Sequence, residues 1–281
     1  MSILASCEFF LLVDFSGIVG LVLLNPSTGR YYRIPYPPYS SGTGRYGICG
    51  TGRYGIYLDD ANNDYKVVRI QNVGMNMEVM VYSLKTYKWR LIERTVEKCY
   101  AWCSVVIGHL LHIVFALKYT KSKKRIGCFD ILAEKWINDV PFPHLNDLEP
   151  VNLTVIDGLL CVTAVDSMWV MKEYGVKDSW FKLMSIASDD VWDWRNITPI
   201  AFGKGSQDEV LCSLYCNSKL EYIWYNVREK KATMATLNAV LPNMTYGYIC
   251  KGSLVDFFGG RNMKLYHPKQ SRRNYYVVYT Q

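Results

Sequence analysis

The sequence has few of the residues and patterns on which most enzyme classes depend. Four histidines occur among 281 residues, and no nucleophile-elbow, HExxH, P-loop or protein-kinase signature is present. No uninterrupted apolar run reaches the roughly 18 residues that a membrane-spanning helix needs. We therefore predict a protein without catalytic residues, bound metal, cofactor or transmembrane helix. A catalytic triad assembled from distant strands is the alternative that a single sequence leaves open.

The composition of a disordered, collagen-like or coiled-coil chain is also absent. Half of the residues are hydrophobic, and 20% are charged. Aromatic residues make up 14%, including 22 tyrosines, and such a composition favours strands over helices. The formal net charge of +7 is spread along the chain. No nucleic-acid-binding motif accompanies this charge, so we predict no nucleic-acid partner.

Disulfide staples and a signal peptide are not expected either. The nine cysteines are an odd number, and Cys128, Cys161 and Cys212 lie in hydrophobic runs typical of a core. The apolar first 24 residues have no Lys or Arg and are interrupted by Glu8 and Asp14, which argues against a signal peptide. We predict a reducing compartment, the cytoplasm or the nucleus.

Short apolar segments recur along the chain in groups, and each group ends with a strand that begins at a recurring position. These positions are 44 to 58 residues apart and are Tyr31, Trp89, Trp136, Trp180 and Ala232. A period near 50 residues with four strands per group is typical of kelch-type propeller blades. The four aromatic residues among them are expected to pack between blades.

In four groups, a small polar residue lies six positions before the last strand. These residues are Asn25, Ser83, Asp130 and Asn226. Their side chains can accept hydrogen bonds from the backbone of a turn, so we predict tight turns at these places.

We therefore predict an all-β fold: a kelch-like β-propeller of about five to six four-stranded blades, in one domain over residues 1–281. A β-sandwich built of unrelated hairpins is the alternative, because its strands come at similar intervals. A short helix is expected within residues 185–194. Residues 275–279 are expected to form a strand that closes the ring.

The same segments resemble the F-box-associated domain of plant F-box proteins. The matching segments are LNPSTGR at 24–30, DYKVVRI at 64–70, VYSLKT at 81–86, WR at 89–90, DGLLC at 157–161 and WVMKEYGVKDSW at 169–180. Together they extend from about residue 25 to residue 224. The resemblance implies a kelch-like propeller that selects a target protein for ubiquitination by a Skp1–cullin–F-box ligase.

The F-box itself is not found in this sequence. In the family, a helical segment that binds Skp1 precedes the propeller, whereas here strand-like sequence begins almost at Met1. Skp1 and cullin are therefore expected as partners only if a longer product supplies an F-box. The alternatives are a stand-alone binding module, a propeller enzyme or lectin, and a basic nucleic-acid binder.

Two glycine-rich segments fit the pattern of a dinucleotide-binding loop. They are the tandem octapeptides GTGRYGIC at 42–49 and GTGRYGIY at 50–57. That fingerprint requires a strand before it and a helix after it, and no helix is predicted here. We interpret the repeat as a local duplication, in which the second copy forms a strand and the first is a loop insertion.

Cys99 and Cys103 followed by His109 and His112 invite a zinc interpretation. The gap between Cys103 and His109 is too short for a zinc finger, and these residues fall on two adjacent predicted strands. Core packing is the interpretation that we prefer.

In a propeller, the loops between the second and third strands share one face with the connections between blades. Here this face collects the basic loop at 118–125 and the aromatic-rich connections at 35–53 and 185–198. Tyr, Trp and Arg dominate protein interfaces. The predicted partner-binding residues are Arg45, Tyr46, Arg53, Lys121, Lys123, Lys124, Arg125, Trp192 and Trp194. The alternatives are a solvated basic hairpin and two tryptophans that cover a blade edge.

Overall fold

The structure is a computed structural model that describes most of the 281 residues. The described residues are 2–7, 10–15, 20–38, 52–73, 76–95, 99–117, 124–145, 151–164, 167–185, 197–203, 206–216, 219–235 and 264–265. They form two compact units. The first contains the described residues up to Asp139 together with 264–265, and the second contains those from Val140 to 235.

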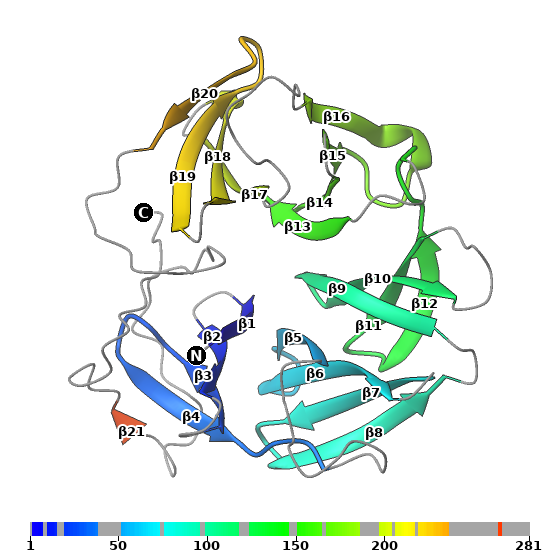
Figure 1. Ribbon diagram of the computed structural model, residues 1–281. Coiled ribbons are helices and arrows are strands. Elements are labelled where there is room, and N and C mark those ends of the chain that lie inside the picture. Colours follow the sequence, from blue (N-terminus) through cyan, green and yellow to red (C-terminus); the bar gives the residue numbers. More distant parts are fainter. Residues whose placement is uncertain are drawn as a thin grey trace. The chain divides into compact units, whose positions relative to one another are not determined.

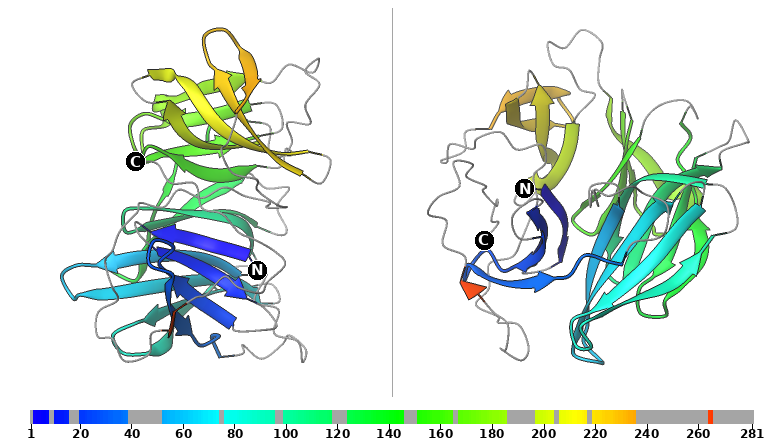
Figure 2. Two further views of the ribbon diagram at one scale, coloured as in Figure 1. Left: turned by 90° about the vertical axis from the view of Figure 1, so that its left-hand side faces the viewer. Right: turned by 60° about the horizontal axis from the view of Figure 1, so that its bottom comes forward.

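The first unit consists of three antiparallel sheets, each with four consecutive strands (Figure 1). The first sheet contains β1 (Ser2–Cys7), β2 (Phe10–Phe15), β3 (Gly20–Leu24) and β4 (Arg30–Ile34). The second contains β5 (Gly52–Asp59), β6 (Asp64–Val73), β7 (Asn76–Ser83) and β8 (Lys88–Arg94). The third contains β9 (Cys99–Ile107), β10 (Leu110–Leu117), β11 (Arg125–Asp130) and β12 (Lys135–Val140). A fifth strand, β21 (Lys264–Leu265), extends the first sheet beside β4 (Figures 1 and 2).

The second unit consists of two further antiparallel sheets of the same kind. The fourth sheet contains β13 (Asn152–Ile156), β14 (Leu159–Thr163), β15 (Ser167–Met171) and β16 (Trp180–Ser185). A single turn of 3₁₀ helix, η2 (Lys177–Ser179), precedes β16. The fifth sheet contains β17 (Ile197–Gly203), β18 (Ser206–Cys216), β19 (Lys219–Asn226) and β20 (Lys231–Met234).

This architecture confirms the predicted all-β, kelch-like propeller fold with four-stranded blades. Within the described ranges there are five blades, and the three residues of η2 are the only helix. The expected helix at 185–194 lies outside the described residues except for Ser185, which ends β16. The expected closing strand at 275–279 also lies outside them, and the assignment of one domain stays a prediction.

Apolar side chains on both faces of the blades form the cores of each unit. Val67 faces the first blade, where it packs with Phe10 and Leu23, whereas the next residue, Val68, packs with Leu111 of the third blade. Successive side chains of a strand point to opposite faces, so a strand buried on both faces reads as an uninterrupted apolar run. In the second unit, a separate cluster joins residues of the fourth and fifth blades.

The predicted polar turn residues are confirmed in four blades. Asn25 Oδ1 accepts the N–H of Ser27 at 2.9 Å, and Asn226 Oδ1 accepts that of Arg228 at 3.0 Å. Ser83 Oγ and Asp130 Oδ1 accept equivalent bonds from the turns that follow them. Four positions after each of these residues the backbone has a positive φ, at Gly29, Tyr87, Glu134 and Lys230. The same turn geometry therefore recurs in four blades, although glycine occupies the positive-φ position in only one of them.

Two of the recurring tryptophans donate hydrogen bonds to the backbone just after the outer strand of the preceding blade. Trp89 Nε1 donates a hydrogen bond of 2.7 Å to the carbonyl of Pro35, the first residue after β4. Within the second unit, Trp180 Nε1 donates one of 2.9 Å to Pro141, the first residue after β12. The Nε1 of Trp136 is buried and has no hydrogen-bond partner in the described part of the chain.

This difference predicts unequal effects of the same substitution. Trp89→Phe removes a satisfied hydrogen bond, which is worth about 1 kcal/mol, whereas Trp136→Phe removes a buried donor that has no acceptor. We therefore expect Trp89→Phe to lower the free energy of unfolding by about 1 kcal/mol more than Trp136→Phe. Urea unfolding of the two variants measures the difference, and an equal or reversed order would contradict the assignment.

Gly52 and Gly55 of the second octapeptide lie inside strand β5, as predicted, and not in a phosphate-binding loop. A Cβ at Gly55 would lie 2.6 Å from Val106 Cγ2 and 3.1 Å from Leu111 Cδ1. A Cβ at Gly52 would lie 2.9 Å from Arg69 Nε. Both glycines therefore allow close packing of the second blade. The first octapeptide lies outside the described residues.

Candidate interaction surfaces

Each blade has two ends with different kinds of connection. The turn end carries the first-to-second and third-to-fourth strand turns, and the loop end carries the second-to-third strand loop and the connection to the next blade. The predicted partner-binding residues all belong to loop ends. Six of them lie outside the described residues: Arg45, Tyr46, Lys121, Lys123, Trp192 and Trp194. The structure places Arg53, Lys124 and Arg125, and partner binding by the whole set stays a prediction.

The two placed arginines differ in their surroundings. Arg125 begins β11, pairs with Asp139 of β12 through a hydrogen bond of 2.6 Å from Nε to Oδ2, and lies 5.5 Å from the centre of the Phe115 ring. Half of its side chain remains exposed. Arg53 is half-buried in β5, and its Nε has no hydrogen-bond partner among the described residues. Arg125 is thus a surface cation whose position is fixed by Asp139, whereas the side chain of Arg53 is partly buried.

Buried polar side chains frame the loop end of the second blade. Glu78 is buried at the start of β7, where Arg94 Nε of β8 donates to its Oε1 at 2.7 Å. Asn72 of β6 forms two hydrogen bonds with the backbone of Ala101 in β9, of 2.9 and 3.1 Å. Arg69 is also buried, and its Nε has no hydrogen-bond partner within the described ranges. These contacts fix the strand ends beside the loop between β6 and β7 and the connection from β8 to β9.

The loop end of the first blade has a similar buried acid. Asp14 of β2 is buried and accepts a hydrogen bond of 2.9 Å from the hydroxyl of Tyr36, which follows β4. Tyr36 is itself 42% exposed. The sequence analysis placed Tyr36 in the partner-facing connection and missed Asp14, Glu78 and Arg69, because acids and bases inside a strand carry no signal of what they contact across the sheet.

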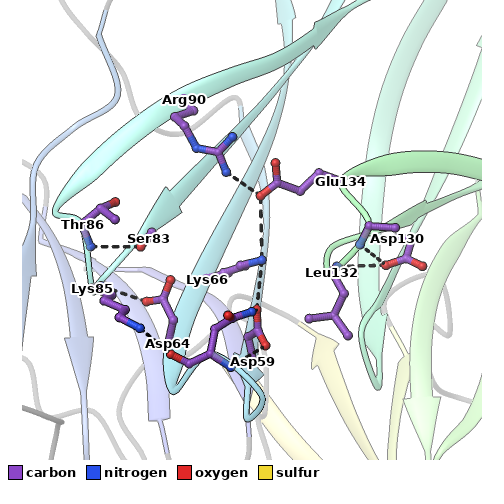
Figure 3. A network of polar contacts seen from close by, with 12 residues as sticks. Asp59, Asp64, Lys66, Ser83, Lys85, Thr86, Arg90, Asp130, Leu132 and Glu134 are labelled. Atoms are coloured by element: carbon purple, nitrogen blue, oxygen red, sulfur yellow. Dashed lines mark hydrogen bonds and ion pairs between the residues drawn. The ribbon is translucent and has the colours of Figure 1, made fainter.

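A network of charges spans the turn ends of the second and third blades (Figure 3). Lys66 Nζ of β6 lies 3.1 Å from Asp59 Oδ2 and 3.8 Å from Glu134 Oε1. Arg90 of β8 also pairs with Glu134, at 2.6 Å. Glu134 belongs to the turn between β11 and β12, so the network joins two blades of the first unit. Asp59, Lys66, Arg90 and Glu134 therefore pair with one another at these turn ends.

The pKa of Asp59 is lowered below its usual value, chiefly by the hydrogen bond from the side chain of Asn62 and also by Lys66. A carboxyl with a lowered folded-state pKa contributes stability above its unfolded pKa. This contribution is lost as the pH falls through the folded pKa. Asp59 is therefore a charged structural group at neutral pH.

We expect Lys66→Met to lower the free energy of unfolding by about 1–3 kcal/mol, because it leaves the buried Asp59 carboxylate without its cation. The matched control is Lys88→Met, a change at an exposed lysine of the outer strand β8 of the same blade, for which we expect less than about 0.5 kcal/mol. Chemical unfolding of both variants at neutral pH measures the difference. Equal losses would show that the network contributes no more than an ordinary surface lysine.

Of the four residues of the rejected zinc interpretation, Cys103 and His112 pack in the core of the third blade, whereas the side chain of His109 is 43% exposed. Cys103 and His112 are buried, and His112 Nε2 lies 3.8 Å from the sulfur of Cys128. Burial lowers the pKa of His112 to about 4. In the part of the chain that the structure describes, no group of three or more His, Cys, Asp or Glu side chains could hold a metal ion.

The cysteines predicted to be core residues are confirmed as such. Cys128, Cys161 and Cys212 are fully buried reduced thiols. Burial raises the pKa of Cys161 to about 12 and also raises that of Cys212. Thiols held so firmly in the neutral form are poor nucleophiles.

The five four-stranded blades define the class of protein as a β-propeller. Residues 1–255 match the family described as the F-box associated beta propeller domain. The chain belongs to this family, which confirms the resemblance found in the sequence.

Curated relatives of the chain are F-box proteins of Arabidopsis thaliana. F-box protein At4g22390 is 24% identical, and the match covers 92% of this chain and 74% of that protein. F-box protein CPR1 is 29% identical, with 79% and 62% covered. F-box protein At1g67130 is 26% identical, with 73% and 43% covered. The chain thus spans about half to three quarters of the length of these relatives.

Among solved structures, dihydro-heme d1 dehydrogenase NirN has a TM-score of 0.44 and 14% identity, and the match covers 82% of this chain and 44% of that one. A likeness this remote carries no argument about function. No helix within the described ranges is long and apolar enough to cross a membrane.

Proposed function

We propose that this chain is a non-enzymatic interaction module that selects a target protein for ubiquitination by a Skp1–cullin–F-box ligase. The observation that carries the proposal is the match of residues 1–255 to the F-box associated propeller family. Relatives that are named as F-box proteins support it. Skp1 and cullin would join through an F-box on a longer product, and the cytoplasm or nucleus would be the compartment.

The loop ends of the blades are the proposed target-binding surface. Loops leave strand ends that contacts such as Glu78–Arg94 and Asn72–Ala101 hold in place. Rigid strand ends beneath variable loops are the usual way in which a β scaffold presents binding residues. The turn ends of the second and third blades offer fewer unpaired charges, because Asp59, Lys66, Arg90 and Glu134 already pair with one another there.

The proposal is tested with two forms of the chain in plant cells: the chain as it exists, and the same chain joined behind the F-box segment of F-box protein CPR1. We expect the fusion alone to recover Skp1 and cullin, and the proteins that bind the unfused chain to gain ubiquitin when the fusion is present. Mass spectrometry of purified complexes and of ubiquitin-modified peptides measures both.

The control is the same fusion with Lys121, Lys123 and Lys124 each changed to Glu, which should still recover Skp1 but lose the targets. Bound proteins that gain no ubiquitin from the fusion would support the alternative, a stand-alone binding module without a ligase role.

A further inference from the structure

The first blade differs from the others at its outer edge. Within the described ranges, the sheets of the other four blades end at β8, β12, β16 and β20, whereas the first sheet continues beyond β4 into β21. β21 pairs antiparallel with β4, with Lys264 opposite Tyr31 and Leu265 opposite Arg30. The family match ends at residue 255. The added strand therefore lies outside the residues that match the family, and it covers the outer edge of β4.

The backbone of β4 offers hydrogen-bonding groups along this edge. Asn25 N–H donates to Arg30 O at 2.9 Å, so the carbonyl of Arg30 points toward β3. In an antiparallel ladder the direction alternates along the strand, so Tyr31 and Arg33 turn their N–H and C=O groups toward the outer edge. The two residues of β21 lie opposite Tyr31 and Arg30, and Arg33 lies beyond them. The edge thus offers more pairing positions than β21 uses.

The charge of the edge does not suit its present occupant. Arg30 and Arg33 are exposed, and no described carboxylate forms an ion pair with Arg33. β21 has the sequence Lys-Leu, so it brings a further basic residue and no acidic residue to this edge. Like charges on neighbouring strands destabilise the pairing, and opposite charges stabilise it. An acidic strand would complement this edge better than β21 does.

We propose that the outer edge of β4 is a docking site for an extended acidic segment of a target protein. The segment adds to the sheet as a strand antiparallel to β4 and displaces β21. Main-chain hydrogen bonds to Tyr31 and Arg33 provide binding, and Glu or Asp side chains beside Arg33 provide selectivity. The proposal rests on the proposed role in target recognition and assigns the class of peptide that is recognised.

The test uses the full chain and a fluorescein-labelled octapeptide of alternating Glu and Val, with an octapeptide of alternating Lys and Val as control. We expect fluorescence polarisation to give a Kd for the acidic peptide that is at least about tenfold lower than that for the basic one. We also expect binding to weaken as NaCl rises from about 50 to about 300 mM. Failure of the acidic peptide to bind, or equal binding of both peptides, would overturn the proposal.

Three variants locate the site. Arg33→Glu should raise the Kd of the acidic peptide at least about fivefold. Tyr31→Pro removes an outward N–H at a place where an edge strand tolerates proline, so it should raise the Kd about tenfold, whereas Tyr31→Thr keeps the N–H and should not. Lys264→Pro should lower the Kd, because it removes the N–H with which β21 pairs to Tyr31.

Thermal unfolding of each variant shows whether it is folded. If Tyr31→Pro is unfolded, the Kd of the Arg33→Glu variant alone tests the site. An unchanged Kd in Arg33→Glu, or in a folded Tyr31→Pro, would refute the site, as would an unchanged Kd in Lys264→Pro. The assay contains no ligase subunit. A variant that no longer binds the acidic peptide can also be tested as the F-box fusion. If that fusion still directs ubiquitination of the targets, this proposal is overturned and the proposed function stands.

Discussion

Gly55→Val is expected to lower the free energy of unfolding by about 3 kcal/mol, a large fraction of the stability of a typical domain. A Cβ at this position would lie 2.6 Å from Val106 Cγ2, and Leu111 on its other side is fully buried. Neither neighbour adjusts easily, because the β-branched Val106 has few alternative rotamers and Leu111 belongs to the core of the second and third blades. Thermal or urea unfolding measures the loss.

The duplicated octapeptide offers a matched control for this experiment. Gly47 has the same place in the first copy as Gly55 has in the second. If the first copy is a loop insertion, as the sequence predicts, Gly47→Val should change the stability by less than about 0.5 kcal/mol. Equal losses at the two positions would refute the interpretation of the repeat.

Acidification is expected to remove about 3 kcal/mol of stability through His112 alone. His112 is fully buried, and burial lowers its pKa from 6.5 to about 4. A histidine with a lowered folded-state pKa binds its proton more readily in the unfolded chain. Its contribution is therefore complete above the unfolded pKa, declines as the pH falls below about 6.5, and is exhausted near the folded value of about 4.

Urea unfolding at a series of pH values between these limits measures this slope. His112→Leu should reduce the slope, since it removes the buried titrating group. His109→Leu is the control: the side chain of His109 is 43% exposed, and this variant should keep the slope of the parent chain. A His112→Leu variant that loses stability with acid as steeply as the parent would show that other groups carry the effect.

Most strands were predictable because the run of apolar residues in each strand indicates that the strand is buried. The second and third strands of each blade are buried on both faces, and they appear in the sequence as apolar runs such as those at β3 and β11. The outer strands were located by their polar turn residues and by Trp89, Trp136 and Trp180. In these places the local sequence and the final packing favour the same structure.

Two first strands escaped the sequence analysis, β1 and β17. Both pair irregularly with their neighbours, with register shifts between Ile3 and Ala5 and between Pro199 and Ala201. A bulge interrupts the alternation of apolar and polar residues, and a proline is unusual within a strand. Their structure is set by pairing with β2 and β18, which the local sequence does not report.

The candidate surfaces were less predictable than the fold. Sequence reasoning could assign loops to one end of a blade, because strand order dictates that. It could not find the contact between Asn72 and Ala101, or that between Lys66 and Glu134, since each joins residues from different blades. It also missed β21, because two residues without a repeat carry no signal for pairing with β4.

The central claim is that the loop ends of this F-box associated propeller bind the target protein. Its most direct test measures the Kd of one identified target for two triple variants that change the charge equally. One carries Lys121, Lys123 and Lys124 changed to Glu, at a loop end. The other carries the same change at Lys88, Lys135 and Lys231, three exposed lysines that begin outer strands at turn ends.

The account predicts that the loop-end variant raises the Kd at least about tenfold while the turn-end variant changes it less than about twofold. An unchanged Kd in the folded loop-end variant, or an equal rise in both, would contradict it.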